Sequence, residues 1–562
     1  MRKDRNTAIM KLRKTVGVMI TVSMIAGLAG CGSSGSNGAK DQSQAEGGGL
    51  QDTQAGGEFT GEPVEASYPL TSEKKQLTVY AKNSNSSVLS SYQEIQAFEK
   101  AAETLGVELV WTHPVAGSET DQYNLMIASQ ELPDIIFWDF SSTSTKLTGL
   151  IDNGSAIDMD SLIRQYAPNY LKALETDEEI MRQALTDEGK FAAMYKLEPT
   201  QARLVTAGPL MRKDLLEQYG LEVPVTIEDW YKNLKTFKEN GMQAPLTVSN
   251  SEPRTSLYFT MSAFQTYYSF YIDPDTGKIA YGPITENYRE WLREMKRWYG
   301  EGLIDPEYTA TDRKTLASNM TGGKSGATMG LLSATIGNLT STARTQNPDY
   351  ELVGCPWPVK AEGDTPYVIN YEAAVRVGGM GAVVTSSCQE PVLAVQVLDY
   401  FYSEEGQDLL NWGIEGVTYE KDGSNNKKFT DGIMKEASGK TPSEAIAPYT
   451  IPALGFTKMM DYDAWAAINL SLPEQFEANK VWAEGSTGMM LPNLELTSEK
   501  NDEYNKIMNE IKTYVDENQI KFITGALDVD SDFEKYVDQI KKMKIETAAA
   551  YMQEAYDAYK NR

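Results

Sequence analysis

An alternation of apolar segments early in the chain limits the fold more than any other feature of this sequence. Residues 77–82 have the β-branched and aromatic content of a strand. Residues 89–105 place apolar side chains at helical spacing and end before Gly106, which is suited to stop a helix. A strand over 107–111, a helix over 122–129 and a strand over 133–138 follow. This order predicts an α/β lobe built on a parallel sheet.

The loops that follow these strands are candidate binding regions, because parallel sheets bind ligands beyond the carboxyl ends of their strands. Asn83 follows the first predicted strand, Trp138 ends the third, and Asp139 comes directly after it. Aromatic rings pack on apolar ligand surfaces, and amides and carboxylates form hydrogen bonds with polar ligand groups. These three residues are therefore candidate ligand contacts, although Trp138 could instead pack in the core.

A second alternating region begins near Ala193. Thr226 and Asp229 have the spacing of a capping box at the start of a helix. Residues 272–280 predict a turn between two short strands and depart from the spacing of a calcium-binding loop. Helices are predicted over 289–300, with Trp291 and Trp298 in the core, and over 389–411 and 498–561.

The chain begins with the pattern of an export signal. Six basic residues and one acidic residue precede an apolar run of about 15 residues, which is short of the ~20 that a membrane-spanning helix needs. The run ends Leu28-Ala29-Gly30-Cys31, which resembles the lipobox of bacterial lipoproteins, whose cysteine is acylated. We expect a signal peptide over residues 1–30 and an acyl anchor, such as palmitate, on Cys31. The alternative is a chance cysteine in an ordinary secretory signal.

Residues 31–72 are expected to form a flexible tether between this anchor and the folded body. The stretch 32–63 is rich in Gly and Ser, and its only large apolar residues are Leu50 and Phe59. Such a composition cannot form a core of its own.

Charge and composition exclude several classes of function. Asp and Glu outnumber Lys and Arg by 79 to 52, and the net charge of −27 argues against nucleic acid and against adsorption to an anionic membrane surface. The single histidine, His113, excludes a site that needs two histidines, such as a His-rich zinc site. Cys355 and Cys388 could form a disulfide or be two buried thiols.

No complete catalytic motif is found in the sequence. Gly322-Gly323-Lys324-Ser325 resembles the end of a phosphate-binding loop, but Ser318 stands where the first glycine is needed. There is no nucleophile elbow, and one histidine argues against a Ser-His-Asp triad. The paired carboxylates of a glycoside hydrolase are not recognisable by inspection in so acidic a chain. We expect no enzyme, no cofactor and no metal.

Several motifs resemble one family, in the same order along nearly the whole mature chain. The first motif is the stretch 121–138, which ends Pro133-Asp-Ile-Ile-Phe-Trp138. The later motifs are Leu210–Leu216, Pro224–Trp230, Gly378-Gly379, Trp412–Gly416, Lys521–Gly525 and Ala555–Tyr559. Together they resemble the family 1 extracellular solute-binding proteins of bacterial sugar ABC importers. The closer likeness is to the large lipoprotein branch of Gram-positive bacteria.

This resemblance implies a two-lobed α/β fold of the type II periplasmic-binding-protein kind, with crossover hinge segments near residues 191–197 and 371–378. The lobes would close over a ligand between them. The implied division is a first lobe over 73–192, a second lobe over 193–375, a return to the first lobe over 376–430, and a C-terminal helical region over 431–562 that packs on the second lobe and the hinge.

The resemblance also implies ligand contacts. Trp138 matches a tryptophan in the sugar site of maltose-binding protein, and residues 251–254 would form a cleft loop that contributes Glu252 and Arg254. Because Arg254 stands where the maltose binder has an aromatic residue, maltose itself is disfavoured as the ligand. Three further aromatic candidates lie on predicted loops, where they could equally be structural: Trp357, Trp412 and Tyr419.

The implied function is that of a monomeric, lipid-anchored protein on the outer side of the cell membrane of a Gram-positive-type bacterium. It would capture an oligosaccharide and deliver it to the membrane permease subunits of an ABC importer, whose ATPase is a separate chain. The alternatives left open are a surface-anchored glycoside hydrolase, a binding protein for a peptide or another solute, and a co-receptor that presents its ligand to a sensor.

Overall fold

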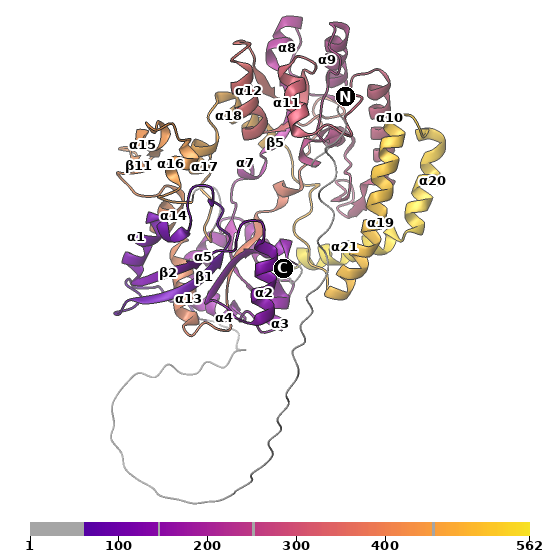
Figure 1. Ribbon diagram of the computed structural model, residues 1–562. Helices are drawn as coiled ribbons and strands as arrows, with labels where there is room; N and C mark the ends of the chain where they lie inside the picture. Colours follow the sequence, from indigo (N-terminus) through magenta and orange to yellow (C-terminus); the bar gives the residue numbers. More distant parts are fainter. Residues whose placement is uncertain (1–60, 144–146, 250–252, 452–455) are drawn as a thin grey trace, which may run out of the picture. The chain divides into compact units, whose positions relative to one another are not determined.

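Two main sheets, each with its own hydrophobic cluster, organise the part of the chain that the structure describes (Figure 1). The computed structural model describes residues 61–143, 147–249, 253–451 and 456–562. Cys31, the predicted signal peptide over residues 1–30, Glu252 and most of the predicted tether lie outside the described residues.

The first sheet contains the parallel strands that the sequence predicts. Strands β1 (Lys75–Ala81), β2 (Val107–Thr112) and β3 (Ile135–Asp139) are parallel and lie in the order β2-β1-β3. Two strands from later in the chain, β10 (Val377–Val384) and β4 (Met194–Leu197), continue the described sheet beyond β3. Both pairs that β10 makes are antiparallel, so the sheet is mixed at this edge.

Helices of the first lobe begin and end close to the predicted positions. Helix α1 (Gln96–Leu105) ends at Gly106, whose φ of 72° is left-handed, as expected of a C-terminal glycine. Helix α2 (Glu119–Ser129) then leads to β3. The other helices between β3 and β4 are α3 (Leu147–Asp152), α4 (Asp160–Tyr166), α5 (Pro168–Leu174) and α6 (Glu178–Ala184).

The helix predicted over residues 389–411 is two helices, α13 (Pro391–Tyr400) and α14 (Glu404–Asn411). The Ser403 side chain caps α14 by accepting a hydrogen bond from the backbone N–H of Gly406. A Cβ at Gly406 would lie 2.1 Å from the carbonyl oxygen of Tyr400, so the turn folds back too tightly for a continuous helix. The helix therefore breaks at this serine and glycine, although the apolar spacing alone predicts one continuous helix.

The second sheet is antiparallel. Strand β5 (Ala207–Arg212) pairs with β8 (Ala327–Leu331) on one side and with β9 (Leu352–Gly354) on the other. The turn predicted over 272–280 is confirmed as an antiparallel hairpin of β6 (Phe270–Ile272) and β7 (Ile279–Tyr281).

Two helices of the second lobe carry the predicted features. Helix α9 (Ile227–Glu239) begins with the capping box of Thr226 and Asp229. Helix α10 (Glu286–Gly300) buries Trp291 and Trp298 completely, which confirms them as core residues. The shorter helices of this lobe are α7 (Gln201–Leu204), α8 (Lys213–Tyr219), α11 (Arg313–Thr321) and α12 (Asn338–Ala343).

The C-terminal part of the chain is helical, as the sequence predicts for 498–561. Helices α19 (Ser498–Ile523), α20 (Val529–Lys542) and α21 (Ile545–Lys560) supply residues to the second cluster, and α19 packs against α10 (Figure 1). Before them come α15 (Asp431–Met434), α16 (Pro442–Ile446), α17 (Tyr462–Asn469) and α18 (Pro473–Ala483).

Residues 431–562 are not confined to the second lobe and hinge, where the sequence analysis placed them. Ala447, Ile451 and Phe456 belong to the first cluster. The Phe456 ring packs against Phe98 of α1, with ring centroids 5.6 Å apart. These apolar side chains are covered by the first lobe because the chain crosses back to it after α16.

Three segments lie side by side at the end of β4, where the chain leaves the first sheet. The N–H of Leu197 donates to the carbonyl of Lys458, and the N–H of Met460 donates back to the carbonyl of Leu197. The N–H of Glu198 donates to the carbonyl of Arg376. These hydrogen bonds tie the three connecting segments together at the place where the sequence analysis expects a hinge.

The predicted tether over residues 31–72 ends earlier than expected. Val64 donates its N–H to the carbonyl of Gln165, and Leu70 donates to that of Leu105. The Tyr68 ring packs edge-on against Tyr400, with centroids 5.4 Å apart. Residues 64–71 are therefore held on the first lobe by backbone hydrogen bonds and one aromatic contact.

Cys355 and Cys388 are free and buried, which confirms the alternative of two thiols. Cys355 lies in the second cluster and Cys388 in the first, so the two are parts of different cores. Burial raises the pKa of the Cys388 thiol to about 11.

Within the described ranges, no helix is long and apolar enough to cross a membrane.

Candidate functional site

Trp138 lies at the carboxyl end of β3 inside an aromatic stack. Its ring is stacked between Tyr80 of β1 and Tyr123 of α2, at centroid distances of 5.7 and 4.9 Å. The residue is 7% exposed, and burial raises the pKa of Tyr80 to about 12. The stack holds Trp138 in one orientation, so a ligand could touch its edge and not its face.

Asp139 forms a sharp corner directly after Trp138. Its Oδ1 accepts hydrogen bonds from the backbone N–H of Ser141 (3.1 Å) and from the Ser141 hydroxyl (2.6 Å), which caps the 3₁₀ turn Phe140–Ser142. The backbone of β10 passes so close that a Cβ at Gly379 would lie 2.4 Å from this carboxylate oxygen. Only glycine allows this approach, which brings β10 against the Asp139 corner.

Asn83 is used mainly to hold its own loop. The side-chain amide donates to the carbonyl of Leu89, and its oxygen accepts from the N–H of Asn85, both at 2.9 Å. The neighbouring Ser84 N–H donates to the Tyr92 hydroxyl. The amide thus fixes the backbone at the carboxyl end of β1.

His113 fastens the same edge of the sheet. Its Nδ1 lies 2.7 Å from the carbonyl oxygen of Ala81, and its Nε2 accepts the N–H of Tyr92 at 3.0 Å. These partners fit the neutral imidazole with its proton on Nδ1. Burial lowers the pKa of His113, against the opposing effect of the bond to Ala81.

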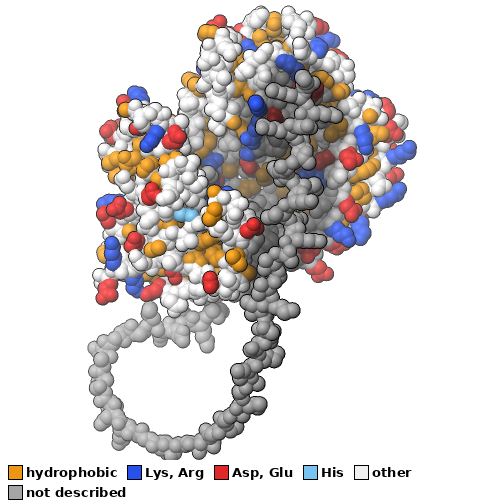
Figure 2. Space-filling view, viewed as in Figure 1, with side chains coloured by type: hydrophobic (Ala, Val, Ile, Leu, Met, Phe, Trp, Pro, Cys, Tyr) orange, Lys and Arg blue, Asp and Glu red, His pale blue; other side chains and the backbone are white. Residues whose placement is uncertain are grey.

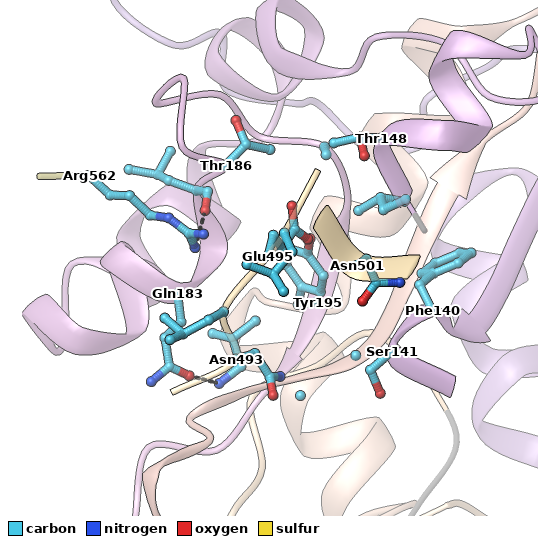
Figure 3. Close-up of a pocket in the computed structure, with 18 of the residues that line it drawn as sticks. Phe140, Ser141, Thr148, Gln183, Thr186, Tyr195, Asn493, Glu495, Asn501 and Arg562 are labelled. Carbon is cyan, nitrogen blue, oxygen red and sulfur yellow. Dashed lines mark hydrogen bonds between the residues drawn. The ribbon is translucent and has the colours of Figure 1, made fainter. Parts of the chain in front are cut away.

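A pocket of about 360 Å³ opens beyond the Asp139 corner and is called here the Ser141 pocket (Figure 3). Its volume lies within the ~300–1,000 Å³ typical of small-molecule sites. Polar side chains that line it are Ser141, Thr148, Gln183, Thr186, Tyr195, Asn493, Glu495, Asn501, Tyr504 and Arg562. Apolar lining comes from Phe140, Leu147, Leu185, Ala192, Val377, Leu494, Leu496 and Met552.

Hydrogen bonds hold part of this lining in place. Gln183 accepts the N–H of Val377 (2.9 Å) and donates to the carbonyl of Ala374 (2.7 Å). Arg562 donates to the carbonyl of Leu185 and to Asp187, both at 2.8 Å. Tyr195, Glu495 and Asn501 point into the same space in Figure 3. Hydroxyl, amide and carboxylate groups between apolar patches suit a ligand with hydroxyls on an apolar ring.

Arg254 is paired with a carboxylate. Its Nη1 donates to Glu372 at 2.7 Å, which ties the second lobe to the 3₁₀ turn Tyr371–Ala374 just before β10. Tyr371 in that turn is 50% exposed. Arg254 itself lies in the 3₁₀ turn Pro253–Thr255, which packs against β8 of the second sheet, and Glu252 falls outside the described residues.

Three aromatic candidates from the sequence analysis are core residues and do not line the Ser141 pocket. Trp357 is 1% exposed and donates its indole N–H to the carbonyl of Trp482. Trp412 and Tyr419 belong to a third cluster, in which Trp412 donates to Asp461 and the Tyr419 hydroxyl to Asp408. Each polar atom already has a partner within the protein, which is why these large rings can be buried.

Most of the pocket lining was missed by the sequence analysis. Asn493, Glu495 and Asn501 lie far along the chain from Ser141, and only Gly378-Gly379 of the β10 motif was singled out in advance. Tyr195 belonged to a predicted crossover and was not named as a contact.

Among the described residues, no group of three or more His, Cys, Asp or Glu could hold a metal ion.

Comparison with known proteins gives one family and several relatives. The family described as bacterial extracellular solute-binding protein matches residues 83–408. Lipoprotein LipO of Bacillus subtilis is 25% identical over 364 residues, which are 61% of this chain and 68% of LipO. The fructooligosaccharide ABC transporter substrate-binding protein FusA of Streptococcus pneumoniae is 23% identical over 491 residues, 83% of this chain and 86% of FusA.

A solved structure is similar over nearly the whole described body. The crystal structure of the alginate-binding protein AlgQ2 without calcium ion matches with a TM-score of 0.61 at 21% identity, over 88% of this chain and 100% of AlgQ2. At this identity the likeness shows the fold alone. It confirms the two-lobed α/β fold of solute-binding proteins that the sequence predicts.

Proposed function

Because this chain belongs to the family of bacterial extracellular solute-binding proteins, we propose that it captures an oligosaccharide and delivers it to an ABC importer. The observation that carries this proposal is the Ser141 pocket beyond the carboxyl end of β3. It lies where ligands of such sheets bind, and it combines hydroxyl, amide and carboxylate groups with apolar patches. The name of FusA, a fructooligosaccharide-binding relative, supports the same class of ligand.

The ligand site in this proposal consists of the Asp139 corner, the edge of Trp138 and the Ser141 pocket. Arg254 and Glu252 would approach from the second lobe as the lobes close. A ligand that contacts both lobes shifts the equilibrium between the open and closed states toward the closed one. The size of this shift is set by the difference between its binding free energies for the two states. The tied segments at Leu197, Arg376 and Lys458 are the hinge of this movement.

The protein would act on the outer face of the membrane through an acyl anchor on Cys31. The lipobox-like sequence, the Gly- and Ser-rich stretch after it and the lipoprotein relative LipO support this anchor. Substitution of Cys31→Ser should release the protein from the membrane fraction into the medium. Retention of the variant on the membrane would contradict the anchor and leave the binding proposal intact.

The partners in this proposal are the permease subunits of an importer, and the protein carries out no chemistry on its cargo. A thermal-shift screen of residues 32–562 against a panel of oligosaccharides tests both parts. A ligand at 100 times its dissociation constant adds about 2.7 kcal/mol to the free energy of unfolding, which raises the melting temperature measurably. The proposal expects such a shift and recovery of the saccharide intact. Absence of any shift would reject saccharide capture, and cleavage products would indicate a glycoside hydrolase.

A further inference from the structure

The Ser141 pocket continues into a second cavity of about 760 Å³. The two cavities share lining residues, among them Thr148, Glu495 and Asn501, so they form one groove. The second cavity extends along α3 and the turn that follows α6. A groove of this volume offers more room than one sugar ring needs.

Carboxylates outnumber cations along this groove. Those that line its two parts are Asp152, Asp158, Asp187, Glu188, Glu495 and Asp502. The Lys and Arg side chains among the described lining are Lys190 and Arg562. The groove therefore carries a negative charge of its own. Acidic and basic side chains are interspersed elsewhere, as on the face shown in Figure 2.

Each of these cations is already paired with a carboxylate. Arg562 donates to Asp187 at 2.8 Å, and its side chain is 5% exposed. Lys190 lies 3.1 Å from Asp158. Outside the groove, Arg254 of the second lobe is paired with Glu372 at 2.7 Å. In each pair the charge of the cation is therefore already offset by a carboxylate.

An anionic saccharide therefore meets two costs in this groove. Its carboxylates or sulfates would lose water in a groove whose cations are each offset by a carboxylate, and they would lie near further carboxylates of the same sign. The net charge of −27 for the whole chain adds repulsion at longer range, which salt screens over about 8 Å at physiological ionic strength. An uncharged saccharide meets neither cost.

We infer that the ligand is an uncharged oligosaccharide and that the groove excludes saccharides bearing uronic acids or sulfates. This inference rests on the proposed function and narrows it to one chemical class. Relatives of this chain differ on that point, since FusA is named for fructooligosaccharides and AlgQ2 for alginate. Fold alone therefore does not decide the charge of the ligand.

The test is a calorimetric titration of residues 32–562 with matched saccharides. The panel holds neutral oligosaccharides, oligogalacturonides, and each neutral binder after oxidation of its primary hydroxyls to carboxylates. We expect a neutral saccharide to bind, with affinity changed less than about twofold between 50 and 500 mM NaCl, because salt screens only charged interactions. We expect its oxidised form to bind about 100-fold more weakly, since like charges brought together cost several kcal/mol.

A pair of charge variants shows whether the groove itself sets this preference. Glu188→Lys adds a cation in the groove. Glu420→Lys makes the same change in net charge in the hairpin of β11 (Tyr419–Lys421), which does not line the groove. Both residues are exposed. Glu188→Lys should reduce the ratio of the affinities for the neutral and the oxidised saccharide several-fold. Glu420→Lys should leave this ratio unchanged.

Four outcomes overturn the inference. Oligogalacturonides that bind when neutral saccharides do not, or an oxidised form that binds as tightly as its parent, would contradict it and leave oligosaccharide capture standing. An equal effect of the two lysine variants would show that net charge and not the groove sets the preference. Absence of binding by any saccharide would reject the proposed function, and this inference with it.

Discussion

Gly379 determines how closely β10 approaches the Asp139 corner. A Cβ there would lie 2.4 Å from Asp139 Oδ1 and from the Cβ of Ser141, whereas a Cβ at Gly378 meets no described atom within 4 Å. Gly379→Ala should therefore lower the free energy of unfolding by about 1–3 kcal/mol, as overpacking does, and should weaken ligand binding. Gly378→Ala is the matched control and should keep nearly wild-type stability. Chemical denaturation of the two variants measures the difference, and equal stabilities would show that the corner relaxes easily.

His113 makes stability depend on pH in a predictable direction. Its pKa in the folded protein is lowered by burial from the ordinary 6.5, so protonation favours the unfolded chain. The stabilising contribution is fully present above about pH 6.5 and is lost as the pH falls through the folded pKa. Because His113 is the single histidine, one imidazole resonance in a tag-free sample reports that pKa. A value at or above 6.5 would contradict the neutral, doubly hydrogen-bonded ring.

Aromatic residues show how far single positions could be read from the sequence. Trp138 was predicted at the carboxyl end of a strand, and it lies there, although its contact with a ligand stays a prediction. Trp357, Trp412 and Tyr419 were chosen as aromatics on loops. Sequence does not tell whether the polar atom of a loop aromatic finds a partner inside the protein, and here each of them does.

At the scale of elements, helix α21 (Ile545–Lys560) links the second core to the first lobe. Ile545 and Ala548 near its start lie in the second cluster. At its end, the Tyr559 hydroxyl donates to Glu179 of α6, and Arg562 donates to Asp187 and to the carbonyl of Leu185. The C-terminal residues therefore fasten this helix to the first lobe beside the groove.

Removal of that fastening is expected to destabilise the end of the helix. Arg562→Ala should cost about 1–2 kcal/mol, because hydrogen bonds to charged groups contribute this much and the partly exposed Asp187 is screened by water. Lys560→Ala is the control, since its pair with Asp557 is exposed and lies within one helix. Thermal unfolding compares the two variants. An Arg562→Ala protein as stable as Lys560→Ala would show that the C-terminus does not hold the lobes.

Elements were predicted well where local patterns decide them. Gly106 and the Thr226 capping box fix helix ends by backbone conformation and by one side-chain hydrogen bond, both of which are local. The break at Ser403 was missed because apolar spacing runs on through 389–411. The place of Phe456 in the first core depends on contacts with residues such as Phe98, which local sequence does not contain.

At the scale of the whole molecule, the order of motifs predicted the two-lobed fold, and the pocket could not be predicted. Its walls come from the turn after β3, from β10 and from the segment that carries Asn493 and Glu495, so they meet only after the chain has crossed between the lobes. The loop 493–497 and the first turn of α19 have no pattern that distinguishes a ligand contact from a solvated surface.

Hydrogen exchange with and without an oligosaccharide found in the thermal-shift screen tests the central claim most directly. If the ligand binds in the Ser141 pocket, exchange should slow in Phe140–Ser142, in residues 377–380 and in residues 493–501, and saturation should leave the saccharide intact. Slowing confined to other segments would place the ligand elsewhere. Unchanged exchange throughout at saturating saccharide would contradict capture at the carboxyl end of the first sheet.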